Sequence, residues 1–228
     1  MAAELEVLSS QKDFSKEDPA EILEKIISAE YYAEKNNTIQ RHLKQAHLTD
    51  STARLQNINY DPSRKINRRQ VEQLITNDYI GSGHNILILG ATGCGKSFFG
   101  NALGINACEA GYRVIFTRMV ELLNSLSVAR AEGNISKLLK KFYPIDLLII
   151  DDFLLTDTTS EEQRDLMEIF EYRGRGKSTI LCSQCAPEEW HTKLGSGYVA
   201  AAILDRVTNN AYSIILEGDS QRKKNTNL

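Results

Sequence analysis

Apolar residues near the start of the chain recur with the period of a helix. Asp18 and Glu21 mark a helix start, because Asp caps free N–H groups and Glu three residues on completes a capping box. An apolar stripe follows with helical spacing, made of Ile22, Ile26, Ala29 and Ala33. The pattern predicts one helix to about His47, then a loop over 48–64 and a short helix over 68–76.

From residue 84 onward, short runs of apolar residues alternate with helical segments. The runs that predict strands are 85–89, 113–117, 146–151, 178–183 and 211–216. The segments that predict helices are 96–110, 119–142, 160–172, 187–194 and 199–209. This alternation implies a parallel sheet covered on both faces. The predicted fold is therefore an α/β domain over 73–228 with a five-stranded parallel sheet, preceded by a small all-helical domain and linker over 1–72.

Composition agrees with a folded globular chain of one or two domains. The 228 residues are 42% hydrophobic and 25% charged, which excludes a disordered chain, a collagen-like chain and a small disulfide scaffold. The longest apolar run, 198–204, falls far short of the ~20 residues that cross a bilayer. The first residues do not read as a secretory signal, and the chain has four cysteines. We therefore expect reduced thiols, a cytoplasmic protein and no membrane partner.

The formal net charge of −3 conceals two regions of opposite sign. Residues 1–30 contain three basic and eight acidic residues, whereas residues 34–69 contain eight basic and three acidic ones. A nearly neutral chain can thus carry a basic surface that meets phosphates. A solvated helix face of mixed charge is the simpler interpretation, and charge alone does not decide between the two.

The strongest chemical signal is a complete P-loop between the predicted strand 85–89 and the predicted helix 96–110. Its glycines let backbone N–H groups wrap phosphates, and the start of the helix adds positive potential. Lys96 is expected to reach the β- and γ-phosphates of ATP, and Ser97 to bind Mg²⁺. The alternative, a chance glycine-rich turn, fits poorly with a full match in this context. The predicted phosphate-binding residues are Gly90, Ala91, Thr92, Gly93, Cys94, Gly95, Lys96 and Ser97.

Two acidic residues stand at the end of the predicted strand 146–151. Asp151, at the tip of a buried strand beside the P-loop strand, is suited to hold Mg²⁺ through water. Asp152 is then placed to orient or deprotonate the attacking water. An apolar strand that ends in Asp is unremarkable alone, but together with a P-loop it predicts an enzyme that hydrolyses nucleoside triphosphates.

Three further polar residues are catalytic candidates. Ser183 and Gln184 end the strand that follows the acidic one, where a polar side chain can hydrogen-bond the attacking water or the γ-phosphate. Polar residues often end strands, so this signal is weak by itself. Arg206 ends a predicted helix and can act as an arginine finger on a neighbouring subunit. A surface ion pair at this place is an equally good interpretation of the sequence.

These motifs together resemble the IstB family, ATPase helpers of a bacterial transposon class that act beside the IstA transposase. The resemblance covers the chain from about residue 18 and rests on the segments GATGCGKS, LLIIDD, SEEQRDLMEIFEYR, CSQ, AAAILDRV and LEGDSQRKK. The family is similar to the DnaC helicase loader, in the initiator branch of AAA+ ATPases. The resemblance implies an AAA+ core that binds and hydrolyses ATP with Mg²⁺, binds duplex DNA, and forms a homo-oligomer with ATP between subunits.

Carried over by position, the resemblance makes Arg206 the finger that acts on a neighbouring subunit and places the sensor-1 position at Ser183 or Gln184. The chain has Asp152 where many AAA+ enzymes have Glu, so hydrolysis is expected to be slow. The sequence also ends twelve residues after the last predicted strand, so no C-terminal lid domain is expected. Arg222 is a weak substitute for the arginine that such a lid supplies.

Two basic clusters are the candidate DNA contacts. In the initiator branch an extra helical element after the second strand faces DNA, and here it corresponds to 118–142. Its lysines share one helix face and can bind phosphates without reading bases. A solvated lysine face is the alternative. The candidates are Lys137, Lys140 and Lys141 in this element and Arg64, Lys65, Arg68 and Arg69 in the linker.

The predicted function is a DNA-binding ATPase that helps a transposase choose or remodel target DNA. Within the same class, a DnaC-like loader of a replicative helicase is the alternative. A metabolic P-loop kinase and a non-hydrolysing structural DNA-binding protein represent other classes, and the basic clusters argue against the kinase. Cys182 and Cys185 form a C-x-x-C pair, but a zinc site needs two more ligands and no second pair exists.

Overall fold

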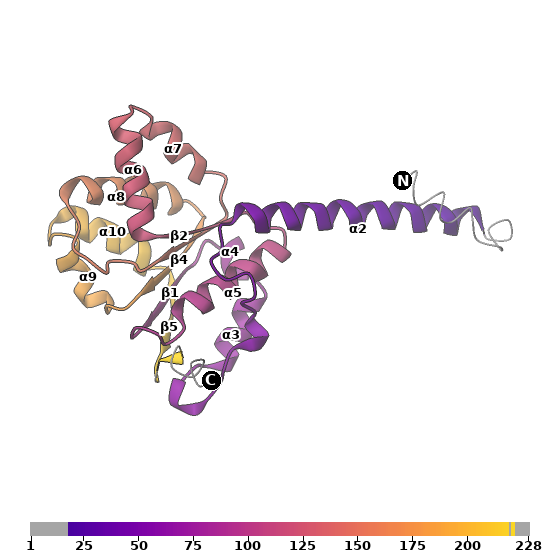
Figure 1. Cartoon of the computed structure of the whole chain (residues 1–228), viewed down its shortest axis with the longest axis horizontal. Helices are drawn as coiled ribbons and strands as arrows, with labels where there is room; N and C mark the ends of the chain where they lie inside the picture. The colour runs from indigo at the N-terminus through magenta and orange to yellow at the C-terminus, as the bar shows by residue number, and fades with distance from the viewer. Residues whose placement is uncertain (1–17, 219, 222–228) are drawn as a thin grey trace, which may run out of the picture.

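A parallel sheet of five strands forms the centre of the molecule in the computed structural model, which describes residues 18–218, 220 and 221 (Figure 1). The strands lie in the order β2-β3-β4-β1-β5, and each neighbouring pair is parallel. All five predicted strands are confirmed, as β1 Asn85–Gly90, β2 Val114–Arg118, β3 Leu147–Asp151, β4 Ser178–Ser183 and β5 Ala211–Leu216.

Helices cover both faces of the sheet. Alternate residues of a strand point to opposite faces, so Ile86 and Ile88 of β1 join a core with α5, whereas Leu87 joins a second core with α6, α8 and α10. Figure 1 shows α3 and α5 on one side of the sheet and α8, α9 and α10 on the other. These helices are α3 Arg68–Ile75, α4 Asp78–Gly81, α5 Lys96–Glu109, α6 Met119–Ala131, α7 Ile135–Phe142, α8 Ser160–Arg173, α9 Pro187–Lys193 and α10 Tyr198–Thr208.

The carboxyl ends of the central strands meet at one edge of the sheet. Every residue of β3 and β4 is buried, as expected for parallel strands with helices on both faces. In the register of the sheet, Leu89 of β1 pairs with Ser183 of β4, and Ile150 of β3 pairs with Leu181 of β4. The ends of β1, β3 and β4, which carry the predicted catalytic residues, therefore lie side by side.

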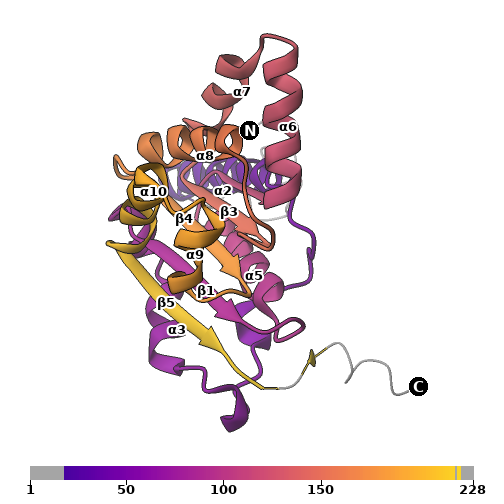
Figure 2. The ribbon, with the colours of Figure 1, turned by 90° about the vertical axis from the view of Figure 1, so that its left-hand side faces the viewer.

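The predicted helix 119–142 is wrong as a single element, because it is broken in two. α6 ends at Ala131 and α7 begins at Ile135. Between them Gly133 adopts a left-handed backbone with φ of 70°, and the N–H of Asn134 closes the turn on the carbonyl of Ala129 at 2.7 Å. The two helices form a hairpin that extends beyond the rest of the core (Figure 2).

The first described element is a long helix, α2 Pro19–Gln45, which projects from the core (Figure 1). Asp18 caps it as predicted, since its side chain accepts the N–H of Ala20 at 3.0 Å. Only Ile26 and His42 are buried along its length. Although α2 has 27 residues, neither it nor another helix of the described residues is apolar enough to cross a membrane.

The linker after α2 packs against α5 and the sheet. Ala46, Ala53, Leu55 and Ile58 belong to the same buried cluster as the residues of α5 and the sheet. Within it lie two 3-10 turns, Leu55–Asn57 and Pro62–Arg64. The predicted domain boundary near residue 72 stays a prediction. Buried apolar side chains tie the linker from Ala46 onward to the core, so by packing the linker belongs with the sheet rather than with α2.

Candidate nucleotide-binding site

The P-loop joins β1 to α5, as its motif predicts. Gly93 and Gly95 have positive φ angles of 83° and 101°, which glycine adopts without a steric penalty. α5 begins at Lys96, so the N–H groups of its first turn face the loop. The ammonium of Lys96 is buried and donates to the carbonyls of Gly90 at 2.7 Å and Ala91 at 2.9 Å. A positive charge is thus held inside the curve of the loop.

A pocket of about 590 Å³ opens over this loop. Its size falls in the range of small-molecule and cofactor sites. Residues far apart in the sequence form its walls, which come from the linker, the P-loop, the ends of β3 and β4, and the segment after β5. Those outside the P-loop include Ile58, Asn59, Arg64, Asp152, Gln184 and Gln221.

Asp151 supplies a buried carboxylate beside the pocket. Burial raises the pKa of this carboxyl, and a hydrogen bond with the Ser97 side chain opposes that shift. Its Oδ1 atom is buried and has no hydrogen-bond partner among the described residues. A carboxylate oxygen of this kind next to a hydroxyl fits Mg²⁺, which prefers hard oxygen ligands. Ser97 and Asp151 would hold the ion, which when bound neutralises charge on the phosphates.

Asp152 lines the pocket immediately after the strand ends. Its φ of 53° lies in the left-handed region, where Asp is better tolerated than most residues. The N–H of Phe153 donates to the carbonyl of Cys182 at 2.8 Å and fixes the chain beyond this turn. The turn exposes the Asp152 side chain to the pocket, as a role in handling water requires, and that role stays a prediction.

The structure separates the two sensor-1 candidates. Ser183 is fully buried, and its hydroxyl donates to the Phe153 carbonyl at 2.8 Å and accepts the indole N–H of Trp190 at 3.3 Å. Gln184 lines the pocket and accepts a hydrogen bond from the Thr92 hydroxyl of the P-loop. Only Gln184 of this pair is therefore placed to meet a phosphate or its attacking water.

Arg206 lies far from the P-loop of its own chain. In the last turn of α10 its Nη1 donates to the Ala202 carbonyl at 2.8 Å, and its own carbonyl accepts from the Asn85 side chain at 3.1 Å. Asn85 begins β1 and Gly90 ends it, so at a rise of ~3.3 Å per residue these edges of the sheet are ~16 Å apart. Arg206 therefore takes no part in the pocket of its own chain.

The expected DNA contact through Arg64 is corrected by the structure. Arg64 is 7% exposed and reaches into the P-loop, where Nη2 donates to the Cys94 carbonyl at 2.6 Å. Lys65 is exposed but pairs with Glu217 at 2.8 Å, and Arg68 lies over the Tyr60 ring at 4.6 Å. Because Arg64 is buried, its side chain is not placed to contact DNA, whereas Lys65, Arg68 and Arg69 are exposed.

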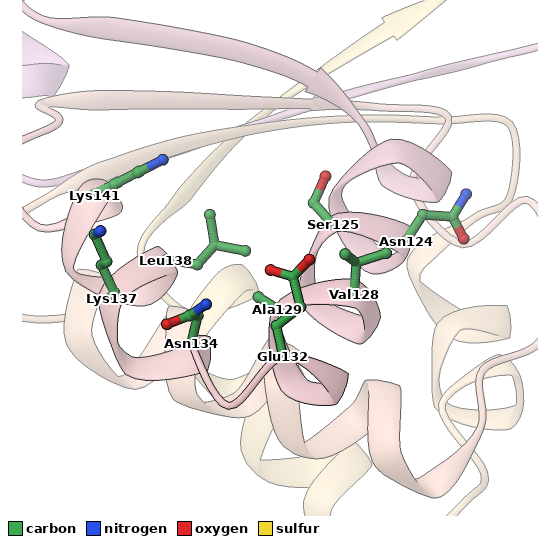
Figure 3. Close-up of a pocket in the computed structure, with 9 residues that line it drawn as sticks. All are labelled: Asn124, Ser125, Val128, Ala129, Glu132, Asn134, Lys137, Leu138 and Lys141. Atoms are coloured by element: carbon green, nitrogen blue, oxygen red, sulfur yellow. The ribbon is translucent and has the colours of Figure 1, made fainter.

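The three lysines of α7 are exposed and lie beside a groove of about 490 Å³ between α6 and α7. Figure 3 shows Lys137 and Lys141 on one side of α7, with Leu138 between them and α6. Lys140 is exposed on the same helix. Figures 1 and 2 place α7 and α3 at opposite ends of the molecule, so the two basic clusters do not form one surface.

Two features of the site were not predicted from the sequence. Arg118 ends β2 directly opposite Asp151 in the register, and its Nε donates to Glu121 at 2.9 Å. A basic residue at the carboxyl end of a predicted strand was the sequence signal that could have placed Arg118 near Asp151. The segment after β5 returns to the P-loop, where the N–H of Gln221 donates to the Gly93 carbonyl at 2.9 Å. No sequence pattern indicates that return, and Arg222 lies outside the described residues.

Fold and site together define an ATP-binding protein with an AAA+ core. A P-loop, an acidic strand end and a polar residue after β4 meet at one edge of a five-stranded parallel sheet. The chain belongs to the family of IstB-like ATP binding proteins, whose model matches residues 1–228.

Relatives of this chain are insertion sequence ATP-binding proteins. One from Sinorhizobium fredii is 36% identical over 168 residues, which are 74% of this chain and 69% of that protein. One from Pseudomonas fluorescens is 35% identical over 146 residues, which are 64% of this chain and 63% of that protein. The chain spans about two thirds of the length of the curated relatives that it matches, at 69%, 64% and 63%.

Solved structures share the fold. The DnaC helicase loader matches with a TM-score of 0.61 at 18% identity, over 73% of this chain and 98% of that chain. The replication initiator DnaA bound to AMPPCP and single-stranded DNA matches with a TM-score of 0.62 at 23% identity, over 76% of this chain and 52% of that chain. At these identities the likeness confirms the fold and carries no activity with it.

Proposed function

We propose that this chain is an ATPase that assembles on duplex DNA when it binds ATP and assists a transposase in selecting and remodelling target DNA. The observation that supports this proposal most directly is that the predicted catalytic residues lie at two opposite edges of the sheet. Lys96 and Gln184 line the pocket and Asp151 lies beside it against Ser97, whereas Arg206 stands at the opposite edge. A second copy that presents Arg206 to this pocket would complete the site.

Each residue then has a distinct part in hydrolysis. Lys96 binds the β- and γ-phosphates, and Gln184 orients the attacking water against the γ-phosphate. Asp152 accepts the proton of that water. Arg206 of a neighbouring copy stabilises the charge that develops in the transition state. Because Asp152 is one methylene shorter than Glu, the reaction is slow and ATP-bound assemblies persist.

DNA binding is assigned to the α6–α7 hairpin and to the exposed arginines of α3. Lys137, Lys140 and Lys141 stand on an exposed helix without a carboxylate within ion-pair distance among the described residues. Lysines of this kind neutralise DNA phosphates and displace counterions, which gives affinity without base specificity. Such binding suits a protein that prepares many different target sequences.

The proposal is tested by light scattering and gel shift with duplex DNA, using wild type and Lys96→Ala in parallel. With ATP and Mg²⁺, wild type is expected to form a larger particle and to retard DNA, and Lys96→Ala to do neither. If wild type stays monomeric and fails to bind DNA under these conditions, the proposal is wrong. Release of phosphate, stimulated by DNA, distinguishes an ATPase from a nucleotide-binding structural protein.

A loader of a replicative helicase is the second candidate, supported by the likeness to the DnaC helicase loader. The names of the relatives favour transposition instead, because they refer to insertion sequences. Pull-down of the tagged chain with the transposase of its own element and with the host helicase separates the two. Capture of the helicase alone would replace the first candidate by the second.

A further inference from the structure

Arg64 joins the linker before the sheet to the P-loop at one wall of the pocket. Its Nη1 donates to the Asn59 carbonyl, five residues earlier in the linker, at 2.9 Å, and its Nη2 donates to the Cys94 carbonyl at 2.6 Å. A Cβ added to Gly95 would lie 3.1 Å from the same Nη2, so the guanidinium sits against the loop backbone. The arginine thus bridges two segments thirty residues apart in the chain.

The segment after β5 contacts the same parts of the structure. The N–H of Glu217 donates to the Arg64 carbonyl at 3.3 Å, and the N–H of Gln221 donates to the Gly93 carbonyl at 2.9 Å. Two consecutive carbonyls of the P-loop, those of Gly93 and Cys94, are therefore held by segments that flank the sheet in sequence. The ion pair between Lys65 and Glu217 joins the two flanking segments to each other.

The hydrogen bond from Arg64 to the Cys94 carbonyl also fixes the direction of the Gly95 N–H group. A trans peptide is planar and places its C=O and N–H on opposite sides. While Arg64 holds the carbonyl of Cys94, the N–H of Gly95 points away from the guanidinium, and both Arg64 and Gly95 line the pocket. Without that donor, the glycines of the loop leave this peptide free to rotate, because glycine accepts many backbone conformations.

Arg64 also adds a permanent positive charge to one wall of the pocket. Its Nε atom is buried and has no hydrogen-bond acceptor among the described residues. A guanidinium with an unused donor, beside a loop built for phosphate, raises the local attraction for an anionic ligand.

We propose that Arg64 is a positioning residue for nucleotide binding, which holds the P-loop in its phosphate-accepting shape and makes ATP affinity depend on docking of the linker. The inference rests on nucleotide binding at the P-loop and is independent of hydrolysis, DNA and transposase. It also assigns a role in the nucleotide site to the linker that follows α2.

The test is a titration of the full-length chain with a fluorescent ATP analogue, without DNA, for wild type, Arg64→Gln and Arg64→Lys. Hydrogen bonds to charged groups contribute enough that Arg64→Gln is expected to weaken binding about tenfold or more. Arg64→Lys keeps the positive charge but cannot make both hydrogen bonds of the guanidinium, so its ATP affinity should lie between those of wild type and Arg64→Gln. Arg175→Gln, an exposed arginine before β4, is the matched control and should bind as wild type does.

Melting curves with and without nucleotide separate positioning from a general loss of stability. If Arg64 positions the P-loop, nucleotide should raise the melting temperature of Arg64→Gln much less than it raises that of wild type. If Arg64→Gln and Arg64→Lys bind the analogue as tightly as wild type, the inference is wrong, even if both melt earlier. If Arg64→Gln does not fold, Arg64→Lys decides by the same comparison. Failure of wild type itself to bind would instead overturn the nucleotide site.

Discussion

At the scale of single residues, the site contains a carboxylate whose surroundings favour a cation. Asp151 is 5% exposed, its Oδ1 has no partner among the described residues, and burial raises its pKa. The ionised form is therefore disfavoured in the folded, metal-free protein relative to the unfolded chain. Binding of Mg²⁺ and ATP would remove this penalty, so the same feature weakens the free protein and strengthens the complex.

Asp151→Asn should stabilise the nucleotide-free protein while abolishing hydrolysis. The folded pKa lies above the unfolded one, so the penalty is full above the folded pKa and disappears as pH falls towards the ordinary value of 3.8. At pH 7 the variant should unfold with a free energy about 1–3 kcal/mol higher than wild type, since it removes a buried charge whose Oδ1 has no hydrogen-bond partner among the described residues.

Denaturant unfolding at several pH values measures this difference, which should shrink as the solution becomes more acidic. Asp152→Asn, which alters the half-exposed neighbour, is the control and should leave stability nearly unchanged. A constant difference between Asp151→Asn and wild type across the pH range would contradict the assignment.

The two residues that end β4 should respond differently to loss of their side chains. Gln184→Ala should lower the rate of single-turnover hydrolysis ~100-fold with little change in ATP affinity, because it removes one oriented donor at the reacting phosphate. Ser183→Ala should instead lower the free energy of unfolding by about 1–3 kcal/mol, since the Phe153 carbonyl loses the buried hydroxyl that donates to it. Equal rates for wild type and Gln184→Ala would remove Gln184 from the site.

At the scale of elements, the α6–α7 hairpin combines buried apolar anchors with exposed lysines. Leu139 and Phe142 anchor α7, while its lysines stay exposed. Arg130 ties α6 to α8 through Glu161 at 2.7 Å and through Asp165. The hairpin is therefore attached firmly along one side and open along the other.

Lys137→Gln with Lys141→Gln should weaken DNA binding and reduce its dependence on salt. Each lost phosphate contact lowers the slope of log affinity against log salt by ~0.9, so the slope should fall by about two. The α2 pair Lys35→Gln with Lys44→Gln removes the same charge from exposed positions and is the control. A slope that does not change in the α7 variant would exclude these lysines from the DNA contact.

The elements that the sequence predicts well are those with strong local signals. Consecutive apolar residues predict all five strands, and the P-loop motif predicts the turn between β1 and α5, where Gly93 and Gly95 have positive φ angles. The break at Gly133 was missed because apolar spacing continues through it, although a glycine in a helix weakens it by ~1 kcal/mol. The burial of Arg64 depends on the Cys94 carbonyl, thirty residues away, which no local pattern reveals.

At the scale of the whole molecule, the chain consists of a compact core and a projecting helix (Figure 1). The described residues before His42 bury little, since Ile26 is the buried residue there. The end of α2 contacts α5, and the linker after it completes the ATP pocket. The projecting half of α2 thus adds little to the core formed by the described residues.

Removal of residues 1–37 should leave the core folded. Residues 18–37, the described part of the lost segment, contribute nothing to the cluster that joins the linker, α5 and the sheet, so the melting temperature should change by only a few degrees, about the effect of 1 kcal/mol. ATP binding should persist, because the pocket residues begin at Asp50. Collapse of the melting transition, measured by circular dichroism, would show that α2 is part of the core.

The division of the site between two copies is tested most directly by mixing two inactive variants. Lys96→Ala does not bind ATP but presents an intact Arg206, whereas Arg206→Ala binds ATP but lacks the finger. Together with DNA, the mixture should regain ATP hydrolysis, because the ATP of one variant meets the arginine of the other. A mixture that stays as inactive as its components, beside an active wild type, would contradict the account.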